Sequence, residues 1–197
     1  MNPFDLIQDA FKEAKDKDDV GQSDREINRS RSQYFVDALA RAFEGYYRRK
    51  NPKVQVFWSG NAAHKSDFKL KELLYDITVC EVDETLSATR RALLSYVTKT
   101  YWIVESEFER NSRSAIIDMS KLVLGRSENL LFIGPSVGPK KGYLDMLAKV
   151  AIGCDGSLHL ALIDHPSEWK SEPRAPEVYS WTEKEWLHMS QLNQTGT

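Results

Sequence analysis

The segment Tyr101–Phe108 places two carboxylates in a run that is otherwise typical of a β-strand. Side chains alternate between the two faces of a strand, so Glu105 and Glu107 are expected on the same face. A second strand-like run, Leu73–Cys80, carries the single acid Asp76 among apolar neighbours, where an unpaired carboxylate is costly. The negative charges of these acids must therefore be compensated in the folded protein. A divalent cation between the two strands would compensate all three carboxylates.

Hydrophobic periodicity predicts helices and strands that alternate along the chain. Apolar residues at three- or four-residue spacing predict helices at 4–14, 32–50, 89–98, 112–124 and 143–150. Besides the two acid-bearing runs, short apolar runs predict strands at 54–58, 130–133 and 158–163. Thr182 and Glu185 form a capping-box pattern, which predicts a short C-terminal helix. This order predicts an α/β fold in which helices flank a mixed central sheet.

Length and composition predict one compact domain with an extension at each end. A chain of 197 residues with 41% hydrophobic content can bury a substantial core. Residues 15–33 are rich in Lys, Asp, Arg, Ser and Gln, so we assign 1–31 to an amphipathic helix and a polar linker. The α/β core is expected over 32–165, and 166–197 is expected to form a C-terminal extension with the short helix.

Charge and hydropathy limit the expected cellular location and the expected kinds of partner. No apolar run approaches the roughly 18 residues that a membrane span needs. The first residues also lack the basic and then apolar order of a secretory signal. We therefore expect a cytoplasmic protein with no membrane partner. The net charge of -2 conceals local basic clusters, so a nucleic-acid partner is allowed but not required.

Other site types find little support in the residue spacing. The histidines show no HExxH pattern, and Cys80 and Cys154 lack a spacing that suits zinc. The segment Gly134–Lys141 joins a predicted strand to a predicted helix but lacks the GxxxxGK[ST] spacing of a phosphate-binding loop. An ordinary turn is therefore favoured there over an anion cradle.

The predicted order of elements, with Asp on one strand and Glu-x-Glu on a later one, resembles the restriction-endonuclease-like superfamily and its PD-(D/E)xK motif. The resemblance covers roughly Ser32–Ile163 and implies that Asp76 and Glu105 bind metal. Glu107 stands where the motif usually places lysine, as in the ExE variant of the motif. The sequence departs from the usual pattern because no Pro precedes Asp76, no Lys follows Glu105, and the separation of 29 positions from Asp76 to Glu105 includes an extra helix-like insert.

The resemblance implies metal-dependent hydrolysis of nucleic-acid phosphodiester bonds. Mg²⁺ or Mn²⁺ would bind such hard oxygen ligands, activate water and offset charge on the phosphate. Asp76 and Glu105 would hold the ion, and Glu44 on the preceding helix would add a further acid. Lys121 on the following helix would replace the missing lysine. The catalytic residues in this interpretation are Asp76, Glu105, Glu107 and Lys121.

The same interpretation assigns the partners, and a second interpretation stays open beside it. Four arginines would bind the phosphates of a nucleic acid, with DNA as the expected partner: Arg90, Arg91, Arg110 and Arg113. Cleavage of two strands would favour a homodimer, and the N-terminal helix offers a surface for a protein partner. Alternatively, the chain is a non-catalytic nucleic-acid- or protein-binding module on the same fold, and Glu44 only forms a surface ion pair on its own helix. Convergence of the three acids would favour catalysis, whereas an Asp76 capped by backbone groups would favour the module.

Overall fold

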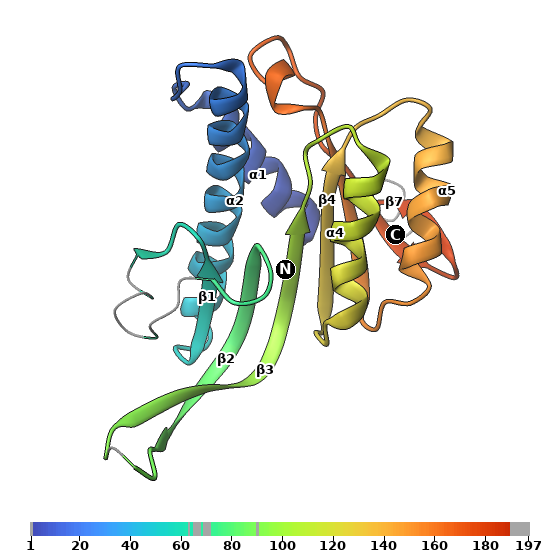
Figure 1. The fold of residues 1–197 in the computed structure, drawn as a ribbon. Coiled ribbons are helices and arrows are strands. Elements are labelled where there is room, and N and C mark those ends of the chain that lie inside the picture. The colour runs from blue at the N-terminus through green and yellow to red at the C-terminus, as the bar shows by residue number, and fades with distance from the viewer. Residues whose placement is uncertain (1, 63, 65–67, 69–71, 90, 190–197) are drawn as a thin grey trace.

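The fold is a seven-stranded mixed sheet between two layers of helices, which confirms the predicted α/β class (Figure 1). A computed structural model describes residues 2–62, 64, 68, 72–89 and 91–189. The helices are α1 (Pro3–Asp16), α2 (Asp24–Arg48), α4 (Ser112–Leu124), α5 (Lys140–Ala151) and the 3₁₀ helix η1 (Pro166–Glu168). The strands are β1 (Val54–Trp58), β2 (Ile77–Leu86), β3 (Leu93–Ser106), β4 (Asn129–Pro135), β5 (Ser157–Ile163), β6 (Glu177–Thr182) and β7 (Glu185–His188).

The strands lie in the sheet in the same order as in the sequence, from β1 to β7. β1, β2 and β3 form an antiparallel group, and β3, β4 and β5 run parallel to one another. Parallel neighbours need a crossover connection, and α4 and α5 provide the two crossovers. β6 and β7 return to antiparallel pairing. The carboxyl ends of the three parallel strands therefore meet at one edge of the sheet, where α/β proteins commonly bind ligands.

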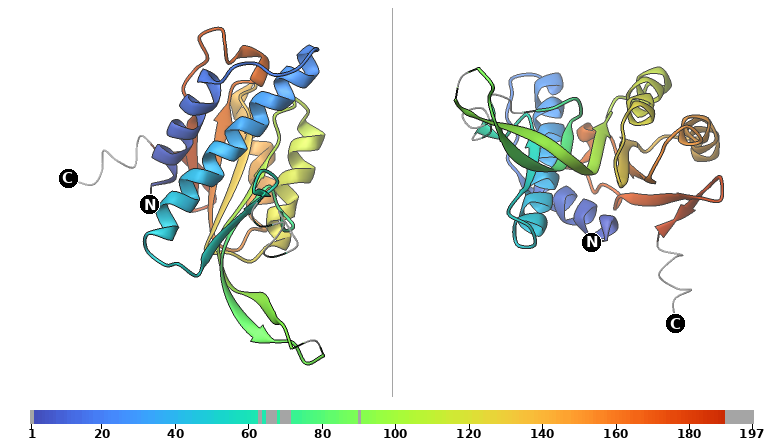
Figure 2. Two further views of the ribbon diagram at one scale, coloured as in Figure 1. Left: turned by 90° about the vertical axis from the view of Figure 1, so that its left-hand side faces the viewer. Right: turned by 90° about the horizontal axis from the view of Figure 1, so that it is seen from below.

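Each face of the sheet packs on its own pair of helices (Figure 2). On one face, Trp102 and Val104 of β3 share a core with Ile7 of α1 and Phe35 of α2. On the other, Ile103 of β3 packs with residues of α4 and α5. The central strands are covered on both sides, as the continuous apolar runs of β4 and β5 predict. No helix in the described part of the chain is long and apolar enough to span a membrane.

The N-terminal helix is part of the core, although the sequence suggests a free surface for a partner. Its apolar face, with Ile7, Ala10, Phe11 and Ala14, is buried. This face lies in the same core as α2, and the Phe11 ring meets Trp169 edge-on with ring centroids 5.2 Å apart. The chain itself therefore covers this apolar face, and the predicted protein partner would have to contact another face of the helix.

Helix α2 begins at Asp24, earlier than the predicted start near Ser32, so the polar linker is shorter than expected. Ser23 and Glu26 form a capping box, in which the side chain of each residue accepts a hydrogen bond from the backbone N–H of the other. This S-x-x-E pattern is the sequence signal for the true start. The residues that follow are polar because they face a groove, not because they are unstructured.

The predicted helix at 89–98 is wrong, because this segment belongs to a long β-hairpin that projects from the body of the molecule (Figure 1). We call residues 82–89 and 91–97 of this hairpin the arm. β1 pairs with β2 only as far as Glu81, and β4 pairs with β3 only from Trp102 onward. Leu93, Leu94 and Val97 have helical spacing, but strand pairing with β2 and the β-branched and aromatic neighbours outweigh it.

The arm is expected to contribute little to stability, because most of its side chains are exposed and its one ion pair with the body, Asp83 with Lys53 at 3.0 Å, is itself half-exposed. Val82 and Val97 are paired across it, so an Asn-Gly turn can replace residues 83–96 and close the hairpin there. This shortening should change the free energy of unfolding by less than about 1 kcal/mol, measured by urea denaturation. A loss of more than about 2 kcal/mol would contradict the prediction and show that the arm packs on the body.

The predicted C-terminal helix is also wrong, because Thr182 and Glu185 flank a two-residue hairpin turn between β6 and β7. Glu183 and Lys184, the two turn residues, have φ angles of 53° and 69°. Positive φ at both positions is the geometry of the turn that best matches the twist of a hairpin, and it does not continue a helix. β6 pairs with β5, so the C-terminal extension continues the central sheet.

Candidate functional site

Asp76 and the end of β3 come together because β2 and β3 are neighbouring antiparallel strands. Ile77, the first residue of β2, lies opposite Val104. The preceding residue, Asp76, therefore reaches Ser106, whose backbone N–H and hydroxyl both donate to Asp76 Oδ2, at 2.8 and 2.6 Å. These two bonds compensate the carboxylate without a cation. No hydrogen bond to Asp76 Oδ1 comes from the described residues.

Glu105 is the most deeply buried of the acids, with only 1% of its surface exposed. Lys121 of α4 holds it, with Nζ 2.9 Å from Glu105 Oε2 and 2.8 Å from Asp118 Oδ1. Burial raises the pKa of Glu105 to about 7, Lys121 opposes this rise and Asp76 adds to it. Burial alone would lower the pKa of Lys121, but its bonds to Asp118 and Glu105 outweigh burial and raise it. The ammonium group therefore stays charged.

Glu107 follows directly after β3 and lies near the same helix. Its backbone N–H donates to Ile133 O at 2.9 Å, which extends the contact between β3 and β4 by one residue. Burial raises the pKa of the Glu107 carboxyl, the N–H of Glu109 lowers it, and Asp118 raises it. Glu105 and Glu107 thus both face α4, as the alternation along the strand predicts.

Two further residues join this cluster, although the sequence analysis did not single them out as site residues. Burial and the nearby Asp76 raise the pKa of Glu72, and Lys121 opposes this effect. The Tyr143 hydroxyl of α5 is buried and bonds to none of the described residues. Burial raises the pKa of Tyr143, and the charge of Glu107 raises it further. No sequence pattern identifies either residue, because their proximity to the acids depends on packing between distant segments.

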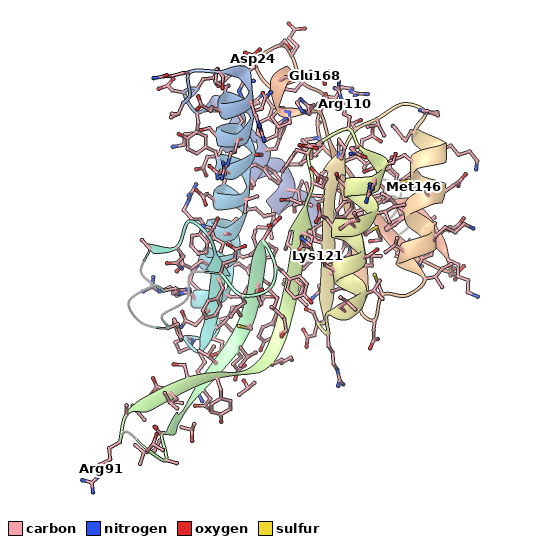
Figure 3. All side chains as sticks on the ribbon, viewed as in Figure 1. Asp24, Arg91, Arg110, Lys121, Met146 and Glu168 are labelled. Carbon is pink, nitrogen blue, oxygen red and sulfur yellow. The ribbon has the colours of Figure 1, made fainter. Side chains whose placement is uncertain are left out.

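A groove of about 980 Å³ opens beside these acids, between α2 and the end of β3. Asp76, Ser106 and Glu107 line it, whereas the buried Glu105 does not. The far wall is the N-terminal half of α2, with Arg25 and Arg29 among its lining residues. Figure 3 shows Asp24, Glu168 and Arg110 at this end of the molecule and Lys121 deeper in its body. The groove gives a ligand of nucleotide size or larger access to Asp76 and Glu107.

The predicted additional acid, Glu44, is not part of this groove. It lies eight residues, or about 12 Å along α2, beyond Val36, the last residue of α2 that lines the groove. Of the residues that the structure describes, no three His, Cys, Asp or Glu side chains are placed to hold one metal ion. The predicted ligand set of Asp76, Glu105 and Glu44 is therefore not assembled, because Glu44 is on a distant turn of the helix.

The three predicted phosphate-binding arginines that the structure describes do not gather around the acids. Arg91 lies at the tip of the arm, far from Lys121 (Figure 3). Arg110 forms an ion pair with Glu168 at 2.5 Å and lines a different cavity, and Arg113 is exposed at the start of α4. Arg90 lies outside the described residues. Arg91 is far from the acids because it lies in a projecting hairpin, where the sequence predicts a helix.

The loop from Gly134 to Gly138 has the spacing of a GxSxG motif and lies between β4 and α5. In hydrolases this motif holds its serine in a strained turn beside a histidine. Here Ser136 does not have a positive φ, and its hydroxyl accepts from Arg174 Nη2 at 3.1 Å. His165, which follows the carboxyl end of β5 at this edge of the sheet, bonds to Ser167 instead. The geometry therefore does not support a serine nucleophile.

The remaining predicted ligands, Asp76 and Glu105, carry carboxylate oxygens, which are the hard ligands that Mg²⁺ takes. This ion usually takes one or two carboxylates and keeps several water molecules, so two ligands are enough. The pair interacts electrostatically, and the buried Glu105 is compensated only in part by Lys121, since its pKa stays raised. A cation beside both carboxylates would relieve this cost. The chemistry of the two carboxylates therefore suits Mg²⁺, whereas Glu105 is bonded to Lys121 and lies outside the lining of the groove.

Comparisons with known proteins add no family to this description. No protein-family model matches the chain, and neither the curated proteins nor the solved structures contain a match.

Proposed function

We propose that this protein is a metal-dependent nuclease with a restriction-endonuclease-like core. The observation that carries the proposal is the nearly inaccessible Glu105, whose pKa is raised to about 7, beside Asp76. A buried carboxylate with a perturbed pKa is costly to the fold and is more common at functional sites than elsewhere. The order helix, antiparallel strands with these acids, helix and parallel strand also agrees with the superfamily that the sequence resembles.

Asp76 and Glu105 would hold Mg²⁺ or Mn²⁺. When bound, the ion would offset the charge of the phosphate and acidify a water molecule. Glu107, which lines the groove with Asp76, would orient an attacking water in the groove and accept its proton. Its raised pKa suits this task, because a stronger base takes up a proton more readily. Lys121 stays charged and balances the acids while the negative phosphate enters.

The substrate in this proposal is a polynucleotide, and DNA is the first to test. A phosphodiester needs acids and cationic donors on opposite sides, and this groove has Asp76 and Glu107 on one side and Arg25 and Arg29 on the other, with Glu105 buried outside its lining. A cytoplasmic location belongs to the same proposal, as does the possibility of a homodimer that cuts two strands.

The test is an assay of the purified full chain on single- and double-stranded DNA and RNA, with Mg²⁺, with Mn²⁺ and with EDTA. Cleavage that needs the metal and is lost in both Asp76→Ala and Glu105→Ala would support the proposal. An Arg91→Ala variant serves as the control, because this side chain is remote from the acids, and its rate should equal that of the wild type. Equal traces of cleavage in all preparations would indicate a contaminating nuclease and would count against the proposal.

A non-catalytic binding module is the second candidate, and one observation favours it. Asp76 already accepts hydrogen bonds from the backbone N–H and the hydroxyl of Ser106, as expected of a structural acid. In that case the wild-type protein should bind nucleic acid or protein without cleaving any of the substrates, and Asp76→Ala should alter its stability but not its binding.

A further inference from the structure

The wall of the groove opposite the acids is a polar stripe on α2. Its members recur at three- and four-residue spacing, so they lie on one face of the helix. The stripe consists of Arg25, Asn28, Arg29, Ser32 and Gln33. The residues of this stripe lie in the segment that the composition suggests is a linker. The groove explains why so long a polar run is nevertheless helical.

Arg25 and Arg29 are exposed and form no ion pair or hydrogen bond through their side chains with any residue that the structure describes. Their neighbours on the same helix behave differently. Arg31 forms an ion pair with Asp19 at 2.7 Å, and Arg41 forms one with Glu13 at 2.6 Å. The two groove arginines therefore keep all their donors available to a ligand.

Most acids of the groove already have hydrogen-bond donors within the protein. Glu26 accepts from the backbone N–H groups of Gln22 and Ser23. Asp76 accepts from Ser106, and Glu107 accepts from the N–H of Glu109. Only the Glu109 carboxylate among the lining acids lacks such a bond from the described residues. These neutral donors leave the carboxylates charged, but none of the four lining acids forms an ion pair with Arg25 or Arg29 among the described residues, so both guanidinium groups remain available to a ligand.

We infer that Arg25 and Arg29 bind the sugar-phosphate backbone of a polynucleotide that lies in this groove. They are four residues apart, which separates them by about 6 Å along the helix axis, so one strand can contact both. Guanidinium groups suit phosphate oxygens because they donate two parallel hydrogen bonds. Asn28 and Gln33 add neutral donors on the same face, whereas the Ser32 hydroxyl already donates to Arg29 O at 2.9 Å. This places the substrate backbone between α2 and Asp76.

This inference rests on the proposed function for the identity of the groove, but binding can be measured apart from cleavage. The experiment is fluorescence anisotropy of labelled single-stranded and duplex DNA with the full chain, in EDTA and over a series of salt concentrations. The variants are Arg25→Ala, Arg29→Ala and the double variant. Arg48→Ala is the matched control, because Arg48 is exposed on the same helix but does not line the groove.

The double variant should bind at least about tenfold more weakly, and Arg48→Ala should bind like the wild type. The slope of log K against log salt should become shallower by roughly 0.7 to 0.9 for each arginine that is removed. Thermal unfolding of the double variant should match the wild type, because both side chains are exposed. Asp76→Asn should still bind, since Asp76 is not assigned to the backbone contact.

Three results would overturn the inference. The first is that the wild type binds neither single-stranded nor duplex DNA, and the second is that the double variant binds DNA as tightly as Arg48→Ala does. The third is that inorganic phosphate displaces DNA at equal concentration, which would indicate a site for a small anion. Cleavage by the wild type that the double variant retains in full would reject the inference and leave the nuclease proposal standing. Binding with the expected salt slopes but without cleavage would keep the inference and reject the nuclease.

Discussion

Replacing Asp76 by Asn is expected to lower the rate of metal-dependent cleavage on the order of a thousandfold. Asn keeps an oxygen that can accept both hydrogen bonds from Ser106, so the junction of β2 and β3 should survive. It loses the negative charge that would hold the cation with Glu105. The effect should therefore fall on catalysis and metal binding, with little change in the free energy of unfolding.

Single-turnover cleavage and isothermal titration with Mn²⁺ would measure the two consequences of Asp76→Asn separately. Asp155→Asn is the matched control, since Asp155 is an exposed acid at the opposite end of the sheet, beside the start of β5. Its rate and its Mn²⁺ affinity should equal those of the wild type. If Asp76→Asn cleaved at the wild-type rate, the cation could not be held by Asp76, and the proposed site would be wrong.

Replacing Glu105 by Gln is expected to abolish cleavage and, in EDTA, to make the protein more stable at pH 8. The side chain is almost wholly buried, and its pKa is raised from 4.5 to about 7. The folded state therefore binds a proton more tightly than the unfolded state. Stability from this group is complete below about pH 4.5 and is lost as the pH rises through about 7.

The expected gain at pH 8 is up to about 3 kcal/mol, since one pKa unit corresponds to about 1.4 kcal/mol. Gln cannot ionise, so it never carries a buried charge, and Lys121 keeps its bond to Asp118. Urea denaturation at pH 4 and at pH 8 would show the difference between the two proteins at the higher pH only. A gain in stability with a loss of activity is typical of a residue kept for function.

Glu44→Gln is the control for Glu105→Gln in the cleavage assay, because Glu44 is a half-buried acid on α2 outside the groove. It should leave cleavage unchanged. If Glu105→Gln were instead less stable than the wild type at pH 8, the bond to Lys121 would outweigh the cost of burial. Glu105 would then be a structural ion-pair partner, and the module interpretation would gain.

The local sequence pattern was enough to predict those helices and strands that show a clear apolar stripe or a continuous apolar run. The helix at 112–124 and the strand at 54–58 have the predicted bounds, and the strand at 157–163 differs by one residue. Alternation along β3 also placed Glu105 and Glu107 on one face. These features depend on the backbone period, which is a property of the segment itself.

Contacts between segments far apart in the sequence determined the rest. Pairing with β2 made a strand of residues 93–98, whose apolar spacing alone suits a helix. The packing of α4 on β3 brought Lys121 to Glu105. The polar residues near the start of α2, whose composition suggests a linker, are helical and line the groove. The same packing left Glu44 and Arg91 away from the acids. Sequence spacing specifies which face a residue occupies, but only the packed neighbours determine what that face meets.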